Sequence, residues 1–313
     1  MQGYKASVKA LVGGGIRLLP PLQRRLTRGL TVFLYHDVTD YPSAFATDFD
    51  LAVSVKTFRR QITWIRNNYS VIHARSLAEG NKLPENAALI SFDDGFRGSF
   101  DNGISLLKQW GLPSIVFLNM RSIAERRPLI AALAAYLERF VPDFAPFARA
   151  AGASAPFHLS LNPRMLELFE QRFGPQDMPA VARYQGACID PDALAAWAAD
   201  GTVAFGSHLF DHWNAPALTE KEFEEQYASN ETSLGALPTS LRMLAFPNGR
   251  YSRTHLALLQ RCGAARAFSS SGGVPRDPGQ FLLDRCSLYE ADCDESRLWF
   301  RVARASTRTP QTN

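Results

Sequence analysis

Short apolar runs alternate with amphipathic stretches along most of this 313-residue chain. Consecutive apolar and β-branched residues predict buried strands, whereas apolar residues three or four positions apart predict helices. The predicted strands are Thr31–Val38, Ser70–Ala74, Ala87–Phe92, Ser114–Asn119, Thr202–Ser207, Arg242–Phe246, Ala265–Ser270 and Phe281–Leu288. The predicted helices are Ser54–Asn68, Ser76–Gly80, Ile104–Trp110, Asp192–Ala199, Thr219–Leu234, Arg253–Arg261 and Asp294–Ala303. This alternation predicts an α/β fold with a mainly parallel sheet, either open or closed as a barrel.

The alternation stops between Arg121 and Asp190, where the chain is rich in alanine and leucine and has helical periodicity. Its apolar faces need a partner surface, so we interpret residues 121–190 as a helical insertion in one α/β domain that spans residues 30–305. A basic segment, residues 1–29, precedes this domain. Residues 306–313 follow it and are predicted to be a frayed tail.

The first 29 residues contain an apolar run that is short, broken by glycines and closed by Arg17. It is too short to span a bilayer and differs from a secretion signal. Arginines and leucines then alternate in an amphipathic pattern. Two interpretations fit this pattern: a solvated helix packed on the domain, or peripheral contact with a membrane. We therefore expect a cytoplasmic protein, with peripheral association at the inner membrane face as the second alternative.

Composition narrows the function classes. Hydrophobic residues make up 46% of the chain and charged residues 20%, as in folded globular proteins. The net charge of +4 is small and no nucleic-acid-binding motif is present, so we expect no nucleic-acid partner. The four cysteines form no Cys-x-x-Cys pair, and we expect them to be reduced thiols.

Candidate chemistry begins where the strand Ala87–Phe92 ends in Asp93, Asp94 and Gly95. In α/β folds the carboxyl ends of strands carry the functional groups. One interpretation is a tight turn shaped by Asp94 and Gly95. Against it, two adjacent carboxylates repel each other, and a bound cation would offset that repulsion.

A second polar cluster, His208 and His212, follows the predicted strand Thr202–Ser207. On a helical turn, histidines four residues apart point the same way and can bind one metal ion. Zincin proteases also use this spacing but require Glu after the first histidine. Leu209 stands there, which excludes that class.

Four motifs occur in a defined order: Tyr-His-Asp-Val at 35–38, Ser-Phe-Asp-Asp-Gly at 91–95, Gly-Ser-His-x-x-x-His at 206–212 and Phe-Pro-Asn-Gly at 246–249. In this order the chain resembles the polysaccharide deacetylases of carbohydrate esterase family four. The resemblance implies the fold of the NodB-homology domain, a distorted (β/α) barrel of seven strands, here with a helical insertion. It also implies a divalent metal, most often zinc, and a groove for an N-acetylated glycan.

Carried over motif by motif, the resemblance assigns Asp94, His208 and His212 as metal ligands and Asp93 as the general base. Substrate contacts are expected from the last motif: Phe246, Pro247, Asn248 and Gly249. Arg97 and Arg285 are further candidates, for ordering Asp93 or for lining the substrate groove.

The chain departs from the family pattern at three places. Leu209 replaces the usual Ser or Thr, and Asn248 replaces an aromatic residue. In addition, no histidine follows His255, although many members carry a general-acid histidine near the C-terminus. Deacetylases that resemble the poly-N-acetylglucosamine type have a circularly permuted motif order, and His36 in the first motif would then supply the acid. The first and last strands of a closed barrel are neighbours, which makes this exchange feasible.

We therefore expect a metal-dependent N-deacetylase of exopolysaccharide biosynthesis, with a glycan or lipid-linked saccharide as substrate. Two alternatives remain. The same site could hydrolyse another amide or an O-acetyl ester, or the chain could be a catalytically weak carbohydrate-binding member of the fold. Retention of Asp93 beside Asp94 favours the enzyme, because binding alone needs no second carboxylate.

Overall fold

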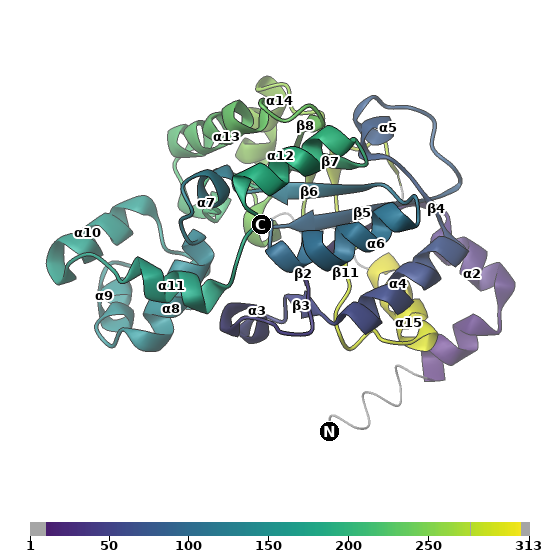
Figure 1. The fold of residues 1–313 in the computed structure, drawn as a ribbon, viewed down its shortest axis with the longest axis horizontal. Helices are drawn as coiled ribbons and strands as arrows, with labels where there is room; N and C mark the ends of the chain where they lie inside the picture. The colour runs from purple at the N-terminus through teal and green to yellow at the C-terminus, as the bar shows by residue number, and fades with distance from the viewer. Residues whose placement is uncertain (1–10, 276, 308–313) are drawn as a thin grey trace.

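The apolar runs form one curled, parallel β-sheet in a computed structural model that describes residues 11–275 and 277–307 (Figure 1). Its strands are β1 Gly29–Tyr35, β4 Ser70–Val71, β5 Asn86–Asp93, β6 Ser114–Leu118, β7 Val203–Ser207, β8 Ser240–Ala245, β9 Arg266–Phe268, β10 Leu282–Leu283 and β11 Cys286–Ser287. A separate pair consists of β2 Asp37–Val38 and β3 Ala52–Val53. Neighbouring strands of the large sheet follow the order β10-β9-β8-β7-β6-β5-β1-β11, and β4 pairs with the start of β5.

One segment closes this sheet into a distorted barrel. The predicted strand Phe281–Leu288 forms two short strands, because residues 284–285 between them leave the ladder. Its first part, β10, pairs with β9, and its second part, β11, pairs with β1. Both edges of the curled sheet therefore meet in a single segment, and the expected distorted (β/α) barrel is confirmed.

The barrel interior is filled by alternate strand residues, as the two-residue period of a β-strand requires. One buried cluster contains Leu30 and Val32 of β1, Leu89 of β5 and Phe117 of β6. The intervening residues point outward into a second cluster under the surrounding helices. Because the strands are covered on both faces, they appear in the sequence as continuous apolar runs.

Helices cover the outside of the sheet (Figure 1). They are α2 Pro20–Thr27, α3 Ala44–Asp48, α4 Val55–Asn68, α5 Ala74–Ala78, α6 Ser105–Gln109, α7 Met120–Ala124, α12 Pro191–Asp200, α13 Glu220–Leu234, α14 Arg253–Arg261 and α15 Glu295–Ser306. A π-helix, Ser99–Ile104, precedes α6. The sequence predicted a regular helix that begins only at residue 104, so helical structure starts earlier than expected. Among the described residues, every helix is too short or too polar to cross a bilayer.

The helical insertion projects to one side of the barrel (Figure 1). It consists of α8 Ile130–Phe140, α9 Phe144–Ala150, α10 Pro163–Phe173 and α11 Met178–Gln185. Its aromatic core is continuous with residues of the barrel rim, including Leu209, Trp213 and Phe246. The insertion therefore shares a core with the domain, as its apolar faces required.

Candidate active site

The two carboxylates lie where β5 leaves the barrel, and a tight turn separates them. Asp93 ends β5, and Asp94 and Gly95 both adopt positive φ angles, 70° and 76°. The Gly95 amide donates to the Asp93 carbonyl over 2.9 Å. A Cβ at Gly95 would lie 2.9 Å from Leu118, so packing as well as backbone conformation requires glycine there. The turn that the sequence indicates is present, and it brings both carboxylates close to His208, whose Nε2 lies 3.7 Å from Asp93 Oδ2 and 3.5 Å from Asp94 Oδ1.

The histidines lie on a loop and not on the predicted helical turn. Residues 208–213 follow β7 without helical structure, and both Leu209 and His212 have positive φ angles, 60° and 63°. The Asn119 side-chain amide donates to the carbonyl oxygens of His208 and Leu209. Leu209 is fully buried in the core shared with the insertion. Tertiary anchoring of this loop, and not the i,i+4 geometry of a helix, makes the two imidazoles converge.

Asp94, His208 and His212 form a compact buried cluster. Asp94 Oδ1 lies 3.5 Å from His208 Nε2 and 3.3 Å from His212 Nε2. One potential ligand atom from each residue lies within 4.8 Å of the others. Burial lowers the pKa of both imidazoles, to about 4 for His212, so they are neutral at pH 7. Neutral imidazoles are the form that binds a metal ion.

The donor set fits a divalent cation. Asp94 Oδ1 is buried and has no hydrogen-bond partner among the described residues, and burial raises the pKa of this carboxyl. His208 Nδ1 lies 2.7 Å from the Ala245 carbonyl oxygen, which favours the tautomer with a lone pair on Nε2. A buried carboxylate oxygen without a donor, facing two imidazole lone pairs, is typical of a metal site.

Asp93 has a different partner, Arg285. The guanidinium donates from Nη1 and Nη2 to the two Asp93 oxygens, 2.7 Å each, and both side chains are buried. Burial alone would raise the pKa of Asp93, but Arg285 and His208 outweigh it and hold the pKa at about 2. Arg285 lies between β10 and β11, in the segment that closes the barrel. Barrel closure therefore keeps Asp93 ionised and oriented.

His36 reaches the same place from the first strand. Tyr35 pairs with Phe92 across β1 and β5, which puts His36 at the level of Asp93. The imidazole is half-buried. Burial lowers its pKa, while the carboxylates of Asp94 and Asp93 oppose that shift. The structure thus brings His36 within electrostatic range of both aspartates.

The remaining predicted site residues, Arg97 and the four residues of the last motif, differ in burial and in partners. Arg97 pairs with Asp101 over 3.2 Å and with Asp190 over 3.6 Å, and its contacts do not include Asp93. Phe246 and Pro247 are buried and support the rim. Only Asn248 of the last motif is exposed, with a positive φ of 56°, and Gly249 lies tightly against Ser270.

Sequence reasoning missed two contributors. Asn119 positions the loop that carries the two histidines. The sequence feature that could have identified it is a polar residue directly after an apolar strand. His158, in the insertion, packs against Phe49 at 5.1 Å and lies within electrostatic range of His212 and Arg250. No local pattern marks His158, because its position depends on how the insertion folds back.

The chain is similar to known proteins in sequence and in fold. The Bacillus subtilis protein YxkH, whose name assigns it to the polysaccharide deacetylases, is 26% identical over 263 residues, covering 82% of this chain and 70% of that protein. IcaB from Ammonifex degensii has a similar fold, with a TM-score of 0.59, 17% identity, and coverage of 88% and 97%. A de-N-acetylase from Aggregatibacter actinomycetemcomitans gives a TM-score of 0.57 at 15% identity, with coverage of 86% and 98%.

The chain also matches a known protein family over a long range. Residues 80–267 match the polysaccharide deacetylase family, and this range is more than half of the chain. It includes Asp93, Asp94 and both histidines of the buried cluster. The chain belongs to the polysaccharide deacetylase family.

Proposed function

We propose that this protein is a metal-dependent N-deacetylase that removes acetyl groups from N-acetylated sugars of a glycan or its lipid-linked precursor. The observation that carries this proposal is the difference in hydrogen bonding between two adjacent carboxylates, since Asp93 accepts two bonds from Arg285 and Asp94 Oδ1 accepts none from the described residues. Asp93 is held by Arg285, while Asp94 faces two neutral imidazoles. A binding protein would have no use for the ionised Asp93 beside a cation site.

Asp94, His208 and His212 would hold the cation. When bound, a divalent ion such as zinc would polarise the acetyl carbonyl and lower the pKa of a water molecule. Three protein ligands leave coordination positions for both. The Ala245 carbonyl and Asn119 keep the imidazoles oriented, through His208 Nδ1 and through the loop backbone.

Asp93 would accept a proton from the attacking water. Its ionised state at neutral pH leaves both oxygens as acceptors, and the two bonds from Arg285 fix the plane of the carboxylate. A fixed base near the reacting water is what general-base catalysis requires. The protonated form of His36, which the carboxylates of Asp94 and Asp93 favour against burial, would then donate a proton to the departing amine nitrogen, because an amine leaves poorly as an anion.

Both the fold relatives and the site support this substrate class. One similar structure is described as a de-N-acetylase, and its likeness here is one of fold. An amide substrate is consistent with a separate acid, His36, beside the base. We place the enzyme in exopolysaccharide biosynthesis on the same grounds.

The test combines metal analysis with amine release. Purified protein is assayed for metal content and for free amine from N-acetylglucosamine oligosaccharides and from an O-acetylated sugar. His208→Ala and His212→Ala are expected to lose metal and turnover together. His73→Ala is the matched control, because His73 lies outside the site at the start of α5 and should leave both unchanged. Full metal occupancy in both variants, or hydrolysis of the ester alone, would contradict the proposal.

A further inference from the structure

The N-terminal part of the described chain exposes an unusual amount of apolar surface. Large apolar side chains with high exposure gather there: Leu11 at 75%, Val12 at 46%, Leu18 at 79% and Leu19 at 53%. Scattered exposed leucines need no explanation, but four within nine residues form a patch. We call Leu11, Val12, Leu18 and Leu19, together with the neighbouring Arg17 and Arg24, the N-terminal patch.

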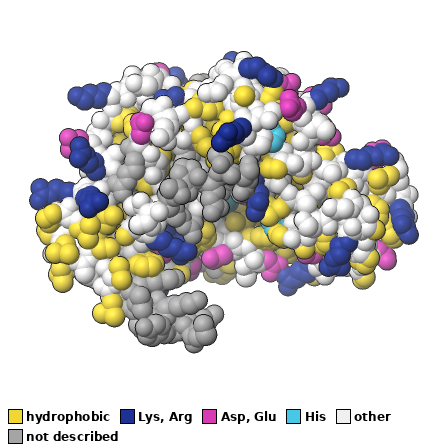
Figure 2. Space-filling model, turned by 180° about the vertical axis from the view of Figure 1, so that it is seen from behind, with side chains coloured by type: hydrophobic (Ala, Val, Ile, Leu, Met, Phe, Trp, Pro, Cys, Tyr) yellow, Lys and Arg dark blue, Asp and Glu magenta, His cyan; other side chains and the backbone are white. Residues whose placement is uncertain are grey.

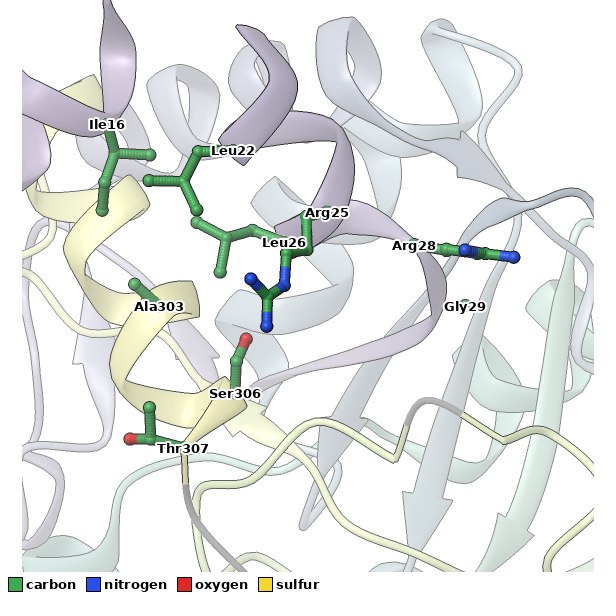
Figure 3. Close-up of a pocket in the computed structure, with 9 residues that line it drawn as sticks. All are labelled: Ile16, Leu22, Arg25, Leu26, Arg28, Gly29, Ala303, Ser306 and Thr307. Atoms are coloured by element: carbon green, nitrogen blue, oxygen red, sulfur yellow. The ribbon is translucent and has the colours of Figure 1, made fainter. Parts of the chain in front are cut away.

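These side chains are exposed because the opposite face of the segment is already used. Ile16, Leu22 and Leu26 turn toward α15, as Figure 3 shows, and they pack into the main core. Gly13 lies against the start of α15 so closely that a Cβ would be 1.7 Å from the Ser296 carbonyl oxygen. The glycine run therefore allows backbone contact with α15 and leaves Leu11 and Val12 facing outward.

The exposed leucines stand at a corner. Residues 11–17 are helical, and α2 begins at Pro20, so the chain turns at Leu18 and Leu19. Proline suits the first turn of α2 because its nitrogen carries no hydrogen, and a first-turn amide would have no acceptor within the helix. Leu18 and Leu19 are therefore exposed at the turn between the two helices.

The sequence segment that carries the patch is basic. Residues 1–36 contain no aspartate or glutamate, and Arg17 and Arg24 are both exposed. Arg17 forms an ion pair with Glu295 over 3.0 Å, and its side chain remains 60% exposed. Apolar and basic side chains lie beside one another at the lower left of Figure 2, where α2 is located.

We propose that the N-terminal patch docks the protein on an anionic lipid bilayer. Leucines at a corner can enter the boundary between headgroups and acyl chains, while arginines beside them contact lipid phosphates. The segment that carries the patch contains basic and no acidic residues, so its charge is complementary to that of anionic headgroups.

The test is co-sedimentation of the full chain with large unilamellar vesicles. Wild-type protein is expected to bind vesicles of 70% phosphatidylcholine and 30% phosphatidylglycerol, and to bind pure phosphatidylcholine much less. Leu18→Ser with Leu19→Ser should lower the partition coefficient at least about tenfold. Arg24→Gln should lower it about fivefold, and 0.5 M salt should do likewise.

Tyr41→Ser is the matched control, because Tyr41 is 92% exposed but lies outside the patch. It should bind as the wild type does. Amine release from a soluble oligosaccharide should be unchanged in all these variants, since none lies in the site. Failure of the wild type to bind anionic vesicles would overturn the proposal. So would a concentration-dependent dimer in light scattering that the double leucine variant abolishes, since the patch would then contact a second copy.

Discussion

The pKa values of two neighbouring aspartates at this site are shifted in opposite directions. Arg285 and His208 outweigh burial and hold the pKa of Asp93 at about 2. Burial raises the pKa of Asp94, which has two neutral imidazoles and no guanidinium in direct contact. Environments that shift the pKa values of two adjacent carboxyls in opposite directions suit the two groups to different roles. Asp93 is suited to accept a proton, and Asp94 is suited to face a cation.

Asp93→Asn should separate these roles. The amide keeps the shape of the side chain but cannot accept a proton, so kcat should fall by about 10²–10⁴-fold while metal content is retained. Arg285 would lose its charge partner in the interior, so the variant should also unfold at a lower temperature. Kinetics are therefore measured well below that temperature. Loss of metal in Asp93→Asn would exchange the roles of the two aspartates.

His36→Ala should affect amide and ester substrates unequally. An amine nitrogen needs a proton to leave, whereas the aryl oxide of an activated aryl acetate needs little assistance. We therefore expect a fall of about 10²–10⁴-fold for N-deacetylation and a much smaller fall for the aryl ester, with metal content unchanged. Equal losses on both substrates would show that His36 supports the fold or the metal and would remove its role as an acid.

At the scale of elements, the acidic turn is held from outside the barrel by the end of the insertion. The Ile189 amide donates to the Gly95 carbonyl, and the Arg97 amide donates to the Ala187 carbonyl, 2.9 Å each. Phe96 and Cys188 form the isolated bridge between the same two segments. The insertion thus contributes to the position of Asp94 as well as to the rim of the site.

Gly95→Ala should damage this turn more than its backbone cost alone. The positive φ costs about 1 kcal/mol for a residue with a Cβ, and the added methyl would also lie 2.9 Å from Leu118. We expect lower thermal stability and at least a tenfold loss of turnover. Gly111→Ala is the control, since Gly111 has a φ of 66° and open space around its Cβ position. It should lose stability by the backbone cost and keep its activity, and equal effects of the two variants would contradict the packing argument.

At the scale of the whole molecule, closure of the barrel assembles the site. Arg285 and Asp93 are 192 residues apart in sequence, and they meet because the segment that carries Arg285 joins β9 to β1. His36 enters from β1, beside that same segment. A histidine of the first strand can therefore occupy a place that a last strand would otherwise supply.

Stability of the whole fold should depend on pH through Glu231 on α13. Burial raises its pKa to about 7, with Arg242 opposing, and Oε1 has no hydrogen-bond partner among the described residues. The folded state therefore keeps a proton that the unfolded state releases above pH 4.5. The stability of the wild type should fall as pH rises from 4.5 to 7 because of this group.

Glu231→Gln removes that dependence. Relative to the wild type, we expect a gain of about 1–3 kcal/mol in the free energy of unfolding at pH 8 and none at pH 4. Urea unfolding at the two pH values measures the difference. A gain of the same size at both values would mean that Glu231 does not change its protonation on unfolding.

The sequence alone determined the elements and the residue types of the site. Strand and helix patterns depend on neighbours a few residues away, so most of the buried strands and the acidic turn were predictable. The predicted strand Thr31–Val38 was wrong at its end, because β1 ends at Tyr35 and Asp37–Val38 form β2 in a separate sheet. The regular helix expected after the turn and the single last strand were predicted less well. A π-helix and a break in the ladder depend on the contacts that those segments make with the rest of the fold.

Only the tertiary structure decided how those residue types act together. His208 and His212 converge because Asn119 and the insertion anchor a loop, and not because a helix aligns them. Arg285 becomes the partner of Asp93 through barrel closure, while Arg97, only four residues from Asp93, pairs with Asp101 and Asp190. Contacts between distant segments depend on how the whole chain folds, and the local sequence pattern does not predict them.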